Sequence, residues 1–449
     1  MTHCLRLLQR PYQTLGCLPA RFSCYSNVAR GKIQTSSSSS CDLNSVYLKK
    51  CSGFGATTIP SHPHTRTVSH KAATFDSTTV EVKDDHLLMR EEGGGSVRIP
   101  FYWLRDNCRC SSCFHHDTNQ ILHNIVDLNL DIKPTDVQSD HCEVTITWDD
   151  CHKTVFSNSW LREYFPGAAD NAMTGEQDIY RTLWQGNYFN MPSFELVDLQ
   201  NDRPTLKKFL QTLHEYGVAL IGGVDTSSEA HANVAKLVAG GIQSTFYHPE
   251  VCVASPGLDI ADTAYTNLAI PLHTDTSYFS PPCRGMTLQI TERSGNGGRT
   301  VISDGFYALE RLRFSQPEYF QLLCDTSITA HYLDDERDMR NCEPVVKMNS
   351  NTKQVERLRF NPFDRATITN LPYEDMLEFY KAYQALAKEI YDDEKAFKIL
   401  LKPDQMVVYD NWRILHARES FTGHRVLKCT YLRHDDWMSQ MRKIGGLRV

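Results

Sequence analysis

The sequence predicts a mainly β protein with flanking helices, in which a double-stranded β-helix (jelly roll) follows a small β-rich amino-terminal domain. Three observations predict this class. Short apolar runs bounded by glycine, proline and polar residues recur along most of the chain, as strands and turns do. Two longer amphipathic segments of the larger domain have helical spacing. Strands that form two packed sheets, with helices outside them, suit a jelly roll.

Length and composition limit the class of protein. With 449 residues the chain can hold two or more domains, and 41% hydrophobic with 22% charged residues is typical of a soluble globular protein. The net charge of −7 argues against a general nucleic-acid-binding protein. No apolar run is long enough for a membrane-spanning helix. We therefore expect neither nucleic acid nor a membrane as a partner.

The start of the chain differs in composition from the rest. Residues 1–40 contain five basic residues, no acidic residue and a terminal serine run. A basic, serine-rich and acid-poor start without a continuous apolar core is typical of a mitochondrial transit peptide. We therefore expect a transit peptide at 1–40 and a location in the mitochondrial matrix. The polar residues 41–75 are predicted to be a disordered linker.

A small β-rich domain is predicted for residues 76–165. Four of its segments are predicted to be strands: residues 80–89, 97–104, 144–148 and 152–156. A glycine-rich turn at 91–96 separates the first two strands. Asp149 and Asp150 indicate a hairpin turn between the last two.

Three cysteines follow one another closely in this domain, so that their thiols can converge within one tight loop: Cys108, Cys110 and Cys113. Zinc in a structural site takes four thiolate or imidazole ligands at the corners of a tetrahedron. His152, at the predicted hairpin, is the best candidate for the fourth ligand, and Cys151 and Cys142 are its rivals. Such a site would be closed and structural, whereas the alternative is a set of unligated thiols.

The larger domain is predicted for residues 191–449 and follows a connection at 166–190. Apolar residues recur at helical spacing between 206 and 213, and again along a predicted helix at 373–391. Short strands with glycine and proline turns lie between and after these helices. This pattern favours a jelly roll with helices packed outside it.

One motif of the larger domain points to metal chemistry. His273 and Asp275 are two residues apart, so in a strand both side chains lie on one face of the sheet. With a second histidine from elsewhere they would form the 2-His-1-carboxylate triad, which binds Fe(II) and leaves positions open for reactants. His-x-Asp/Glu occurs five times in this chain, against about two expected by chance, so context must support it. Apolar and small polar residues surround His273, as in a largely buried strand.

The third metal ligand should come from a late strand of the same domain. Met406 to Val408 begin a predicted strand, a turn forms at Asp410 and Asn411, and His416 lies just beyond it. Alone, a histidine is more often a hydrogen-bonded core or surface residue than a ligand. As the partner of His273 and Asp275, His416 is the predicted third ligand.

An iron oxygenase also needs an electron source, such as the keto acid 2-oxoglutarate. Its remote carboxylate needs a fixed cation, and the guanidinium fork of arginine donates two parallel hydrogen bonds to a carboxylate. Arg425, nine residues after His416, begins the next predicted strand, and Thr300 can add a hydroxyl group. Arg413 and Arg418 are rivals, and a surface salt bridge is the alternative role of Arg425.

Several segments together resemble a known family: residues 103–108, 262–266, 273–279, 297–300 with 304–307, 360–366 and 410–423. Over about residues 76–449 the chain is similar to the trimethyllysine and γ-butyrobetaine dioxygenases, Fe(II)/2-oxoglutarate oxygenases of carnitine biosynthesis. The resemblance implies three sites: Fe(II) at His273, Asp275 and His416, 2-oxoglutarate at Arg425 and Thr300, and structural zinc at Cys108, Cys110, Cys113 and His152. It also implies ascorbate as the reductant and a homodimer.

Members of this family hold a quaternary ammonium group in an aromatic cage, because ring faces replace water around a cation that cannot donate hydrogen bonds. Tyr247, Tyr265 and Tyr431 match the cage positions, and Asp262 and Asn361 match polar contacts to the rest of the substrate. The tryptophan that the family usually places shortly after the first of these tyrosines is missing here. The cage is therefore three-sided, or the substrate differs.

The resemblance implies hydroxylation of N6-trimethyllysine at C3, the first step of carnitine biosynthesis. The alternative is γ-butyrobetaine or another quaternary-ammonium substrate, which the altered stretch after Tyr247 permits. A hypothesis of another class is a zinc-stapled binding protein that has lost activity. The complete set of predicted iron and 2-oxoglutarate residues argues against this last hypothesis.

Overall fold

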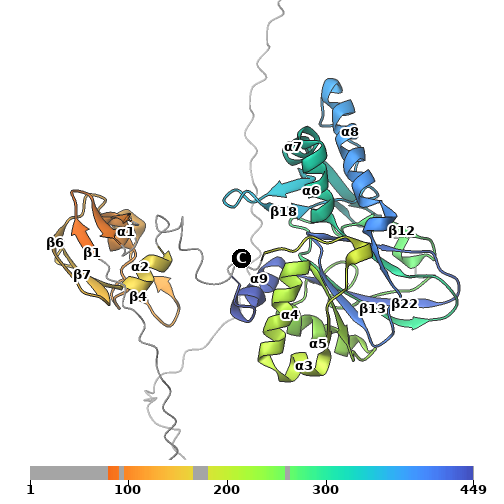
Figure 1. The fold of residues 1–449 in the computed structure, drawn as a ribbon, viewed down its shortest axis with the longest axis horizontal. Coiled ribbons are helices and arrows are strands. Elements are labelled where there is room, and N and C mark those ends of the chain that lie inside the picture. The colour runs from red at the N-terminus through yellow and green to blue at the C-terminus, as the bar shows by residue number, and fades with distance from the viewer. Residues whose placement is uncertain (1–78, 91–95, 165–179, 258–262, 448–449) are drawn as a thin grey trace, which may run out of the picture. The chain divides into compact units, whose positions relative to one another are not determined.

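The computed structural model describes residues 79–90, 96–164, 180–257 and 263–447, which include two folded parts (Figure 1). The amino-terminal part comprises residues 79–164 and the larger part residues 180–447. The predicted transit peptide (1–40) and linker (41–75) lie outside the described residues, as does Asp262.

The amino-terminal part contains small antiparallel sheets around one core. One sheet has β1 (Thr79–Val82), β2 (His86–Arg90) and β3 (Ser96–Pro100), and another has β6 (Pro134–Ser139), β7 (Glu143–Trp148) and β8 (Lys153–Ser157). A short pair has β4 (Phe114–His115) and β5 (Gln120–Ile121), and the helices are α1 (Phe101–Asp106) and α2 (Asn158–Tyr164). Their apolar faces meet around residues such as Leu87, Ile146 and Trp148, each at most 1% exposed.

Two predicted strands of this part were wrong in extent. The predicted strand at 80–89 is two strands, because the chain turns after β1 and the N–H of Lys83 donates to the carbonyl of His86 at 2.9 Å. The predicted strand at 97–104 ends at Pro100, and the helix α1 begins at Phe101. Proline readily ends a strand because it lacks the N–H that a ladder requires. The predicted hairpin of residues 144–148 and 152–156 is confirmed by the pairing of β7 with β8.

Two sheets form the larger part. The six-stranded sheet has the order β11–β22–β13–β20–β10–β9: β9 (Ser193–Glu195), β10 (Val218–Gly222), β11 (Cys252–Ala254), β13 (Gly285–Arg293), β20 (Met406–Asp410) and β22 (Arg425–Leu432). The four-stranded sheet has the order β12–β21–β14–β19: β12 (Ile270–His273), β14 (Thr300–Asp304), β19 (Phe397–Ile399) and β21 (Ile414–Arg418). Neighbouring strands are antiparallel, apart from β9 with β10.

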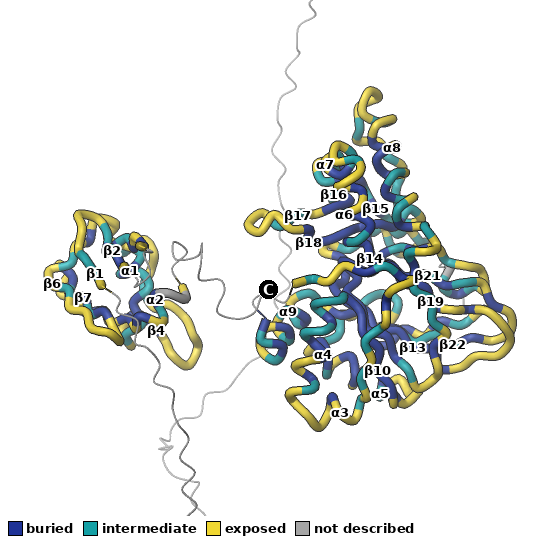
Figure 2. Tube along the Cα trace, in the orientation of Figure 1, coloured by how far each residue is buried: buried dark blue, intermediate teal, exposed yellow. Residues whose placement is uncertain are grey.

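The two sheets pack against each other through apolar side chains. Met286, Leu288 and Val407 of the six-stranded sheet share one core cluster with Ile302 and Ile414 of the four-stranded sheet. Figure 2 shows most of β10, β13 and β14 buried, and the residues of β10 and β14 are buried throughout. Strands covered on both faces lose the alternation of apolar and polar residues. This sandwich is the jelly roll that the sequence predicts.

Helices cover the outer face of each sheet. α4 (Arg203–Tyr216), α5 (Ser228–Ala239) and α9 (His434–Lys443) pack on the six-stranded sheet, and α6 (Gly305–Ser315), α7 (Pro317–Asp325) and α8 (Tyr373–Ile390) pack on the four-stranded sheet (Figure 1). α3 (Leu196–Asn201) precedes α4, and two hairpins follow α7: β15 (Ser327–Leu333) with β16 (Asp338–Pro344), and β17 (Val346–Met348) with β18 (Val355–Leu358). α4 and α8 confirm the two predicted helices. A helix suited to crossing a bilayer is not found in the described part of the chain.

Candidate active site

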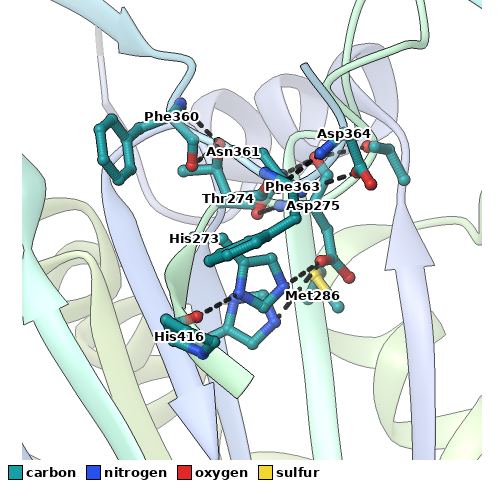
Figure 3. A network of polar contacts seen from close by, with 12 residues as sticks. His273, Thr274, Asp275, Met286, Phe360, Asn361, Phe363, Asp364 and His416 are labelled. Carbon is teal, nitrogen blue, oxygen red and sulfur yellow. Dashed lines mark hydrogen bonds and ion pairs between the residues drawn. The ribbon is translucent and has the colours of Figure 1, made fainter. Parts of the chain in front are cut away.

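His273 and His416 face each other across a strand pair. His273 is the last residue of β12, and its Cα partner on β21 is His416. Asp275 follows two residues later, in a bend rather than in the strand that the motif predicts. The Oδ1 atom of Asp275 lies 2.9 Å from Nε2 of His273 and 3.6 Å from Nε2 of His416. The structure therefore brings the three predicted metal ligands together (Figure 3).

These distances fit a single metal ion. Adjacent ligand atoms of an octahedral ion with bonds of about 2.1 Å lie about 3 Å apart, close to the spacing of the three side chains. The Nδ1 atom of His273 donates to the carbonyl of Pro271 at 2.8 Å. This bond places the proton on Nδ1 and leaves the Nε2 lone pair directed at the site. The residues present therefore fit a divalent metal such as Fe(II).

The protonation of Asp275 and His416 also suits a metal. Burial opposes ionisation of Asp275, but His416 and the bonds from His273 and Tyr431 hold its pKa well below the usual range. Burial, together with the nearby His273, lowers the pKa of His416 to about 4. For His273 burial is outweighed by Asp275, so that its pKa is raised. An anionic carboxylate beside a neutral imidazole is a donor set for a dication.

Two residues outside the triad fix Asp275. The hydroxyl of Tyr431 donates to Oδ2 of Asp275 at 3.1 Å. The side chain of Asn411 accepts from the N–H of Asp275 at 2.9 Å and donates to its carbonyl at 3.0 Å. The backbone and one carboxylate oxygen are thus held, and Oδ1 is left to point at the two imidazoles. Sequence reasoning missed Asn411 and assigned Tyr431 only to the cage, because neither contact follows from spacing along the chain.

A pocket opens onto the triad and contains a buried arginine. Arg425 lines this pocket together with Thr300, and it is only 3% exposed. Burial, and next the charge of Arg418, lowers the pKa of Arg425 to about 9. Within the described residues Arg425 makes no ion pair, and its Nε–H has no hydrogen-bond partner. A buried cation without an anion is costly, so the pocket suits a ligand that brings a carboxylate.

The rival arginines are engaged elsewhere. Arg413 makes two hydrogen bonds to the carboxylate of Asp304, at 3.0 and 2.8 Å, and is 1% exposed. Arg418 also lines the pocket, but its guanidinium donates to three backbone carbonyls, those of Ala264, Thr266 and Leu268. Both guanidinium groups therefore hold the fold together, which leaves Arg425 as the arginine suited to an incoming carboxylate.

Four tyrosines line the pocket. Tyr247, Tyr265 and Tyr431 are there as predicted, and Tyr278 joins them. The hydroxyl groups of Tyr247 and Tyr278 lie 2.8 Å apart, and the Tyr265 hydroxyl lies 3.4 Å from Sγ of Cys252. The sequence analysis missed Tyr278, although it lies within the quoted segment 273–279. Its ring provides a further aromatic residue in the pocket wall beside Tyr247.

A loop after β18 completes the pocket with Asn361, Phe363 and Asp364 (Figure 3). Asn361 has a structural role: its carbonyl oxygen accepts from the N–H groups of Phe363 and Asp364, at 3.1 and 3.2 Å, and its amide donates to Asp364 and to the carbonyl of Thr274. Phe363 and Asp364 were missed by sequence reasoning. Asp262, the other predicted polar contact, lies outside the described residues.

A second group of ligand atoms lies in the amino-terminal part. The Nε2 atom of His152 is 3.2 Å from Sγ of Cys108 and 3.5 Å from Sγ of both Cys110 and Cys113. In a tetrahedron with Zn–S of about 2.3 Å and Zn–N of about 2.05 Å, the nitrogen and sulfur atoms are about 3.5 Å apart. The four side chains therefore fit zinc. The rivals Cys142 and Cys151 are exposed and lie outside this group.

Two family models and several known proteins match the chain. Residues 183–431 match the family described as "Taurine catabolism dioxygenase TauD, TfdA family", and residues 78–171 match "Gamma-butyrobetaine hydroxylase-like, N-terminal". The chain is 33% identical to the mitochondrial trimethyllysine dioxygenase of Homo sapiens, over 78% of this chain and 83% of that protein. It is 28% identical to the gamma-butyrobetaine dioxygenase of Homo sapiens, over 78% and 91%. A solved taurine dioxygenase from Burkholderia xenovorans matches with a TM-score of 0.43 and 17% identity, over 56% of this chain and 89% of that chain.

Proposed function

The chain belongs to the trimethyllysine dioxygenase family, within the wider TauD, TfdA family, and from this premise we propose that it hydroxylates N6-trimethyllysine at C3. The reaction would consume O₂ and 2-oxoglutarate at Fe(II) and begin carnitine biosynthesis. One observation supports this most: the Nε2 atoms of His273 and His416 and the Oδ1 atom of Asp275 converge on a pocket that also holds the buried Arg425.

The iron would be held by His273, Asp275 and His416. Bound Fe(II) supplies the activation of O₂, coupled to the oxidative decarboxylation of 2-oxoglutarate to succinate and CO₂. The protein's own part is binding and orientation. Tyr431 holds one carboxylate oxygen of Asp275 and Asn411 holds its backbone, so that the other oxygen is aimed at the imidazoles.

Arg425 would bind the remote carboxylate of 2-oxoglutarate, and the hydroxyl of Thr300 would assist it. Two parallel hydrogen bonds from a guanidinium fix both the position and the plane of a carboxylate. Burial strengthens this attraction, since few waters compete with the ligand. The ligand would in turn supply the negative charge that Arg425 lacks within the described residues.

Ring faces of Tyr247, Tyr265, Tyr278 and Tyr431 would hold the trimethylammonium group. A quaternary ammonium cannot donate hydrogen bonds, so aromatic faces are its natural partners. Fixing this end would orient the carbon chain and place the target C–H bond toward the metal. The higher identity to trimethyllysine dioxygenase, 33% against 28% for gamma-butyrobetaine dioxygenase, favours the longer substrate.

The test is product analysis by mass spectrometry. The purified chain is incubated with Fe(II), 2-oxoglutarate, ascorbate and O₂, with N6-trimethyllysine in one arm and γ-butyrobetaine in another. We expect trimethyllysine to gain one oxygen and to release one equivalent of succinate. His416→Ala should abolish both products, whereas His424→Ala, which changes an exposed histidine, should retain them.

Other outcomes would favour the alternatives. Oxygenation of γ-butyrobetaine alone would make that compound the substrate. The third hypothesis, an inactive zinc-binding protein, would be favoured if the chain bound zinc but bound neither Fe(II) nor 2-oxoglutarate under anaerobic conditions.

We further propose how the rest of the chain is organised. A structural zinc would stabilise a domain at 76–165, with Cys108, Cys110, Cys113 and His152 as its ligands. This domain would follow a transit peptide (1–40) and a linker (41–75), and a connection (166–190) would lead to the oxygenase domain (191–449). Relatives that carry "mitochondrial" in their names support a mitochondrial location, and we propose that the compartment is the matrix. We propose ascorbate as the reductant and a homodimer as the assembly.

A further inference from the structure

A carboxylate that the sequence analysis did not single out lines the same pocket as the triad. Asp364 lies in the loop after β18 and contributes to the pocket wall with His273 and Asp275. One of its carboxylate oxygens accepts a hydrogen bond from the Asn361 amide at 2.7 Å, and its N–H donates to the carbonyl oxygen of Asn361 at 3.2 Å. These contacts fix the orientation of Asp364 within the loop.

The loop itself is fastened to the segment that carries the metal ligands. The N–H of Thr274, between His273 and Asp275, donates to the carbonyl of Phe360 at 2.8 Å. In return the N–H of Phe360 donates to the hydroxyl of Thr274 at 3.0 Å. The carbonyl of Asp364 also accepts from the N–H of His331 at 2.7 Å. Asp364 is therefore held by hydrogen bonds in the wall of the pocket that the triad also lines (Figure 3).

The chemistry of the proposed substrate places a cation in this neighbourhood. In N6-trimethyllysine the α-ammonium group is attached to C2, the carbon next to the proposed target C3. Wherever C3 meets the metal, the α-ammonium must lie only two bonds away. The tyrosine faces suit the distant trimethylammonium, whereas a primary ammonium needs acceptors for its three hydrogens. A fixed carboxylate is the strongest such acceptor.

We propose that Asp364 binds the α-ammonium group of the substrate and so determines specificity for an amino acid over a simple betaine. This inference rests on the proposed hydroxylation of N6-trimethyllysine. γ-Butyrobetaine carries a carboxylate two bonds from its C3 and has no α-ammonium. Trimethyllysine carries the same carboxylate on C2, so Asp364 would repel that group in both molecules. Only in trimethyllysine would the attraction between Asp364 and the α-ammonium offset this repulsion.

The experiment compares three compounds on the full chain: N6-trimethyllysine, its desamino analogue 6-(trimethylammonio)hexanoate, and γ-butyrobetaine. Asp364→Asn keeps the shape of the side chain and an oxygen for the Asn361 bond, but removes the charge. We expect kcat/KM for trimethyllysine to fall roughly 10- to 100-fold, as for the loss of a hydrogen bond to a charged group. We expect no loss for the desamino analogue and an unchanged or improved kcat/KM for γ-butyrobetaine.

Two further measurements separate recognition from support of the metal site. The dissociation constant of trimethyllysine, measured by calorimetry without oxygen, should rise by the same factor, while the affinity for Fe(II) stays constant. Asp364→Glu, which retains the charge, should recover part of the affinity. Asp338→Asn removes an exposed carboxylate that pairs with Arg340 and should behave like the wild-type chain.

Equal losses for trimethyllysine and its desamino analogue would overturn the assignment of Asp364. A weakened affinity for Fe(II) would do the same, since the residue would then act through His273 or Asp275. Both results leave the proposed function intact, because the wild-type chain still oxidises trimethyllysine. If the wild-type chain itself fails to oxidise that compound, the proposed function is wrong and this inference is wrong with it.

Discussion

Tyr431 donates its hydroxyl hydrogen to the Oδ2 atom of Asp275 over 3.1 Å, from a different sheet than the one that carries both histidines. Asp275 thus has one oxygen engaged by the protein and one directed at the two imidazoles. A ring assigned from the sequence to substrate binding therefore also orients a predicted metal ligand. The spacing between ligands can be supported in this way by residues that never touch the metal.

Replacing Tyr431 with phenylalanine should weaken metal binding more than substrate binding. The change keeps the aromatic face but removes the hydrogen bond to Asp275, and such supporting contacts affect metal affinity by about 10- to 100-fold. We expect an anaerobic Fe(II) titration to show a loss of this order. Tyr278→Phe is the matched control, because it removes a hydroxyl that contacts Tyr247 and keeps the Tyr431 bond to Asp275. Equal Fe(II) affinities in the two variants would show that the Tyr431 contact is unimportant.

Arg425→Lys should raise the KM for 2-oxoglutarate about 10- to 100-fold while the positive charge is kept. Lysine cannot reproduce the two parallel hydrogen bonds of the guanidinium fork. Arg299→Lys, at an exposed pair with Glu419, should leave this KM unchanged. A larger effect from Arg418→Lys than from Arg425→Lys would mean that the anchor is Arg418.

Arg425→Met should have opposite effects on stability in the two ligation states. Without ligand the buried guanidinium pairs with no anion in the part of the chain that the structure describes, so its removal should raise the melting temperature. With saturating 2-oxoglutarate the wild-type chain should be the more stable, since a ligand stabilises the state that binds it. Thermal melts with and without the keto acid test this crossover.

Removing one thiol of the amino-terminal cluster should release zinc and unfold that part of the chain. Cys113→Ser takes away a ligand that is 5% exposed, and binding free energy at such a site contributes directly to folding. We expect metal analysis to find one zinc in the wild-type chain and none in the variant, with an additional low-temperature melting transition. Cys142→Ser, at an exposed thiol, is the control and should keep the metal. Zinc retained by Cys113→Ser would contradict the four-ligand assignment.

His231 should make the larger part sensitive to acid. This imidazole is fully buried between α5 and the sheet, where it contacts the side chains of Thr287 and Gln289 at 2.8 and 3.0 Å. Burial lowers its pKa to about 4. The unfolded chain therefore takes up a proton near pH 6.5 and the folded chain only near pH 4, so stability is full above the first value and falls between them.

The decrease in the free energy of unfolding follows from the difference between the two pKa values of His231. It amounts to about 3 kcal/mol by pH 4, since each pKa unit corresponds to about 1.4 kcal/mol. We expect urea unfolding curves of the wild-type chain to show this decline relative to His231→Gln, whose own stability at pH 7 is lower because two buried contacts change. Parallel pH dependences in the two proteins would contradict the prediction.

Sequence patterns predicted the elements with strong periodicity. The helix α4 follows from apolar residues at helical spacing and from Gly217, whose left-handed φ of 77° ends it. Patterns failed where a turn or helix start depended on local chemistry, as at Lys83 and Pro100. Of the apolar residues along α8, Phe379 and Tyr383 are buried, whereas Tyr380 is 44% exposed. Tertiary packing, which the sequence does not display, decides how wide the apolar face of a helix is.

The residues of the candidate site could also be predicted only in part. Residues that form a recognisable sequence motif, such as the His273 and Asp275 pair, could be found from the sequence. Asn411, Tyr278 and Asp364 could not, because their roles arise from contacts between segments that are distant in sequence. Arg413 and Arg418 remained rivals of Arg425 until the structure revealed that the first pairs with Asp304 and the second with backbone carbonyls.

The direct pairing of β12 with β21 makes the spacing of the two imidazoles a property of sheet register. β21 is clamped on its other edge by β14, so shifting it by one residue would break two ladders at once. Such a shift would turn the side chain of His416 to the other face of the sheet and out of the pocket. A partly functional intermediate register is therefore not available. Variation that preserves the sandwich therefore leaves the geometry of oxidation untouched, and the pocket walls are free to diverge toward new substrates around an inherited reaction centre.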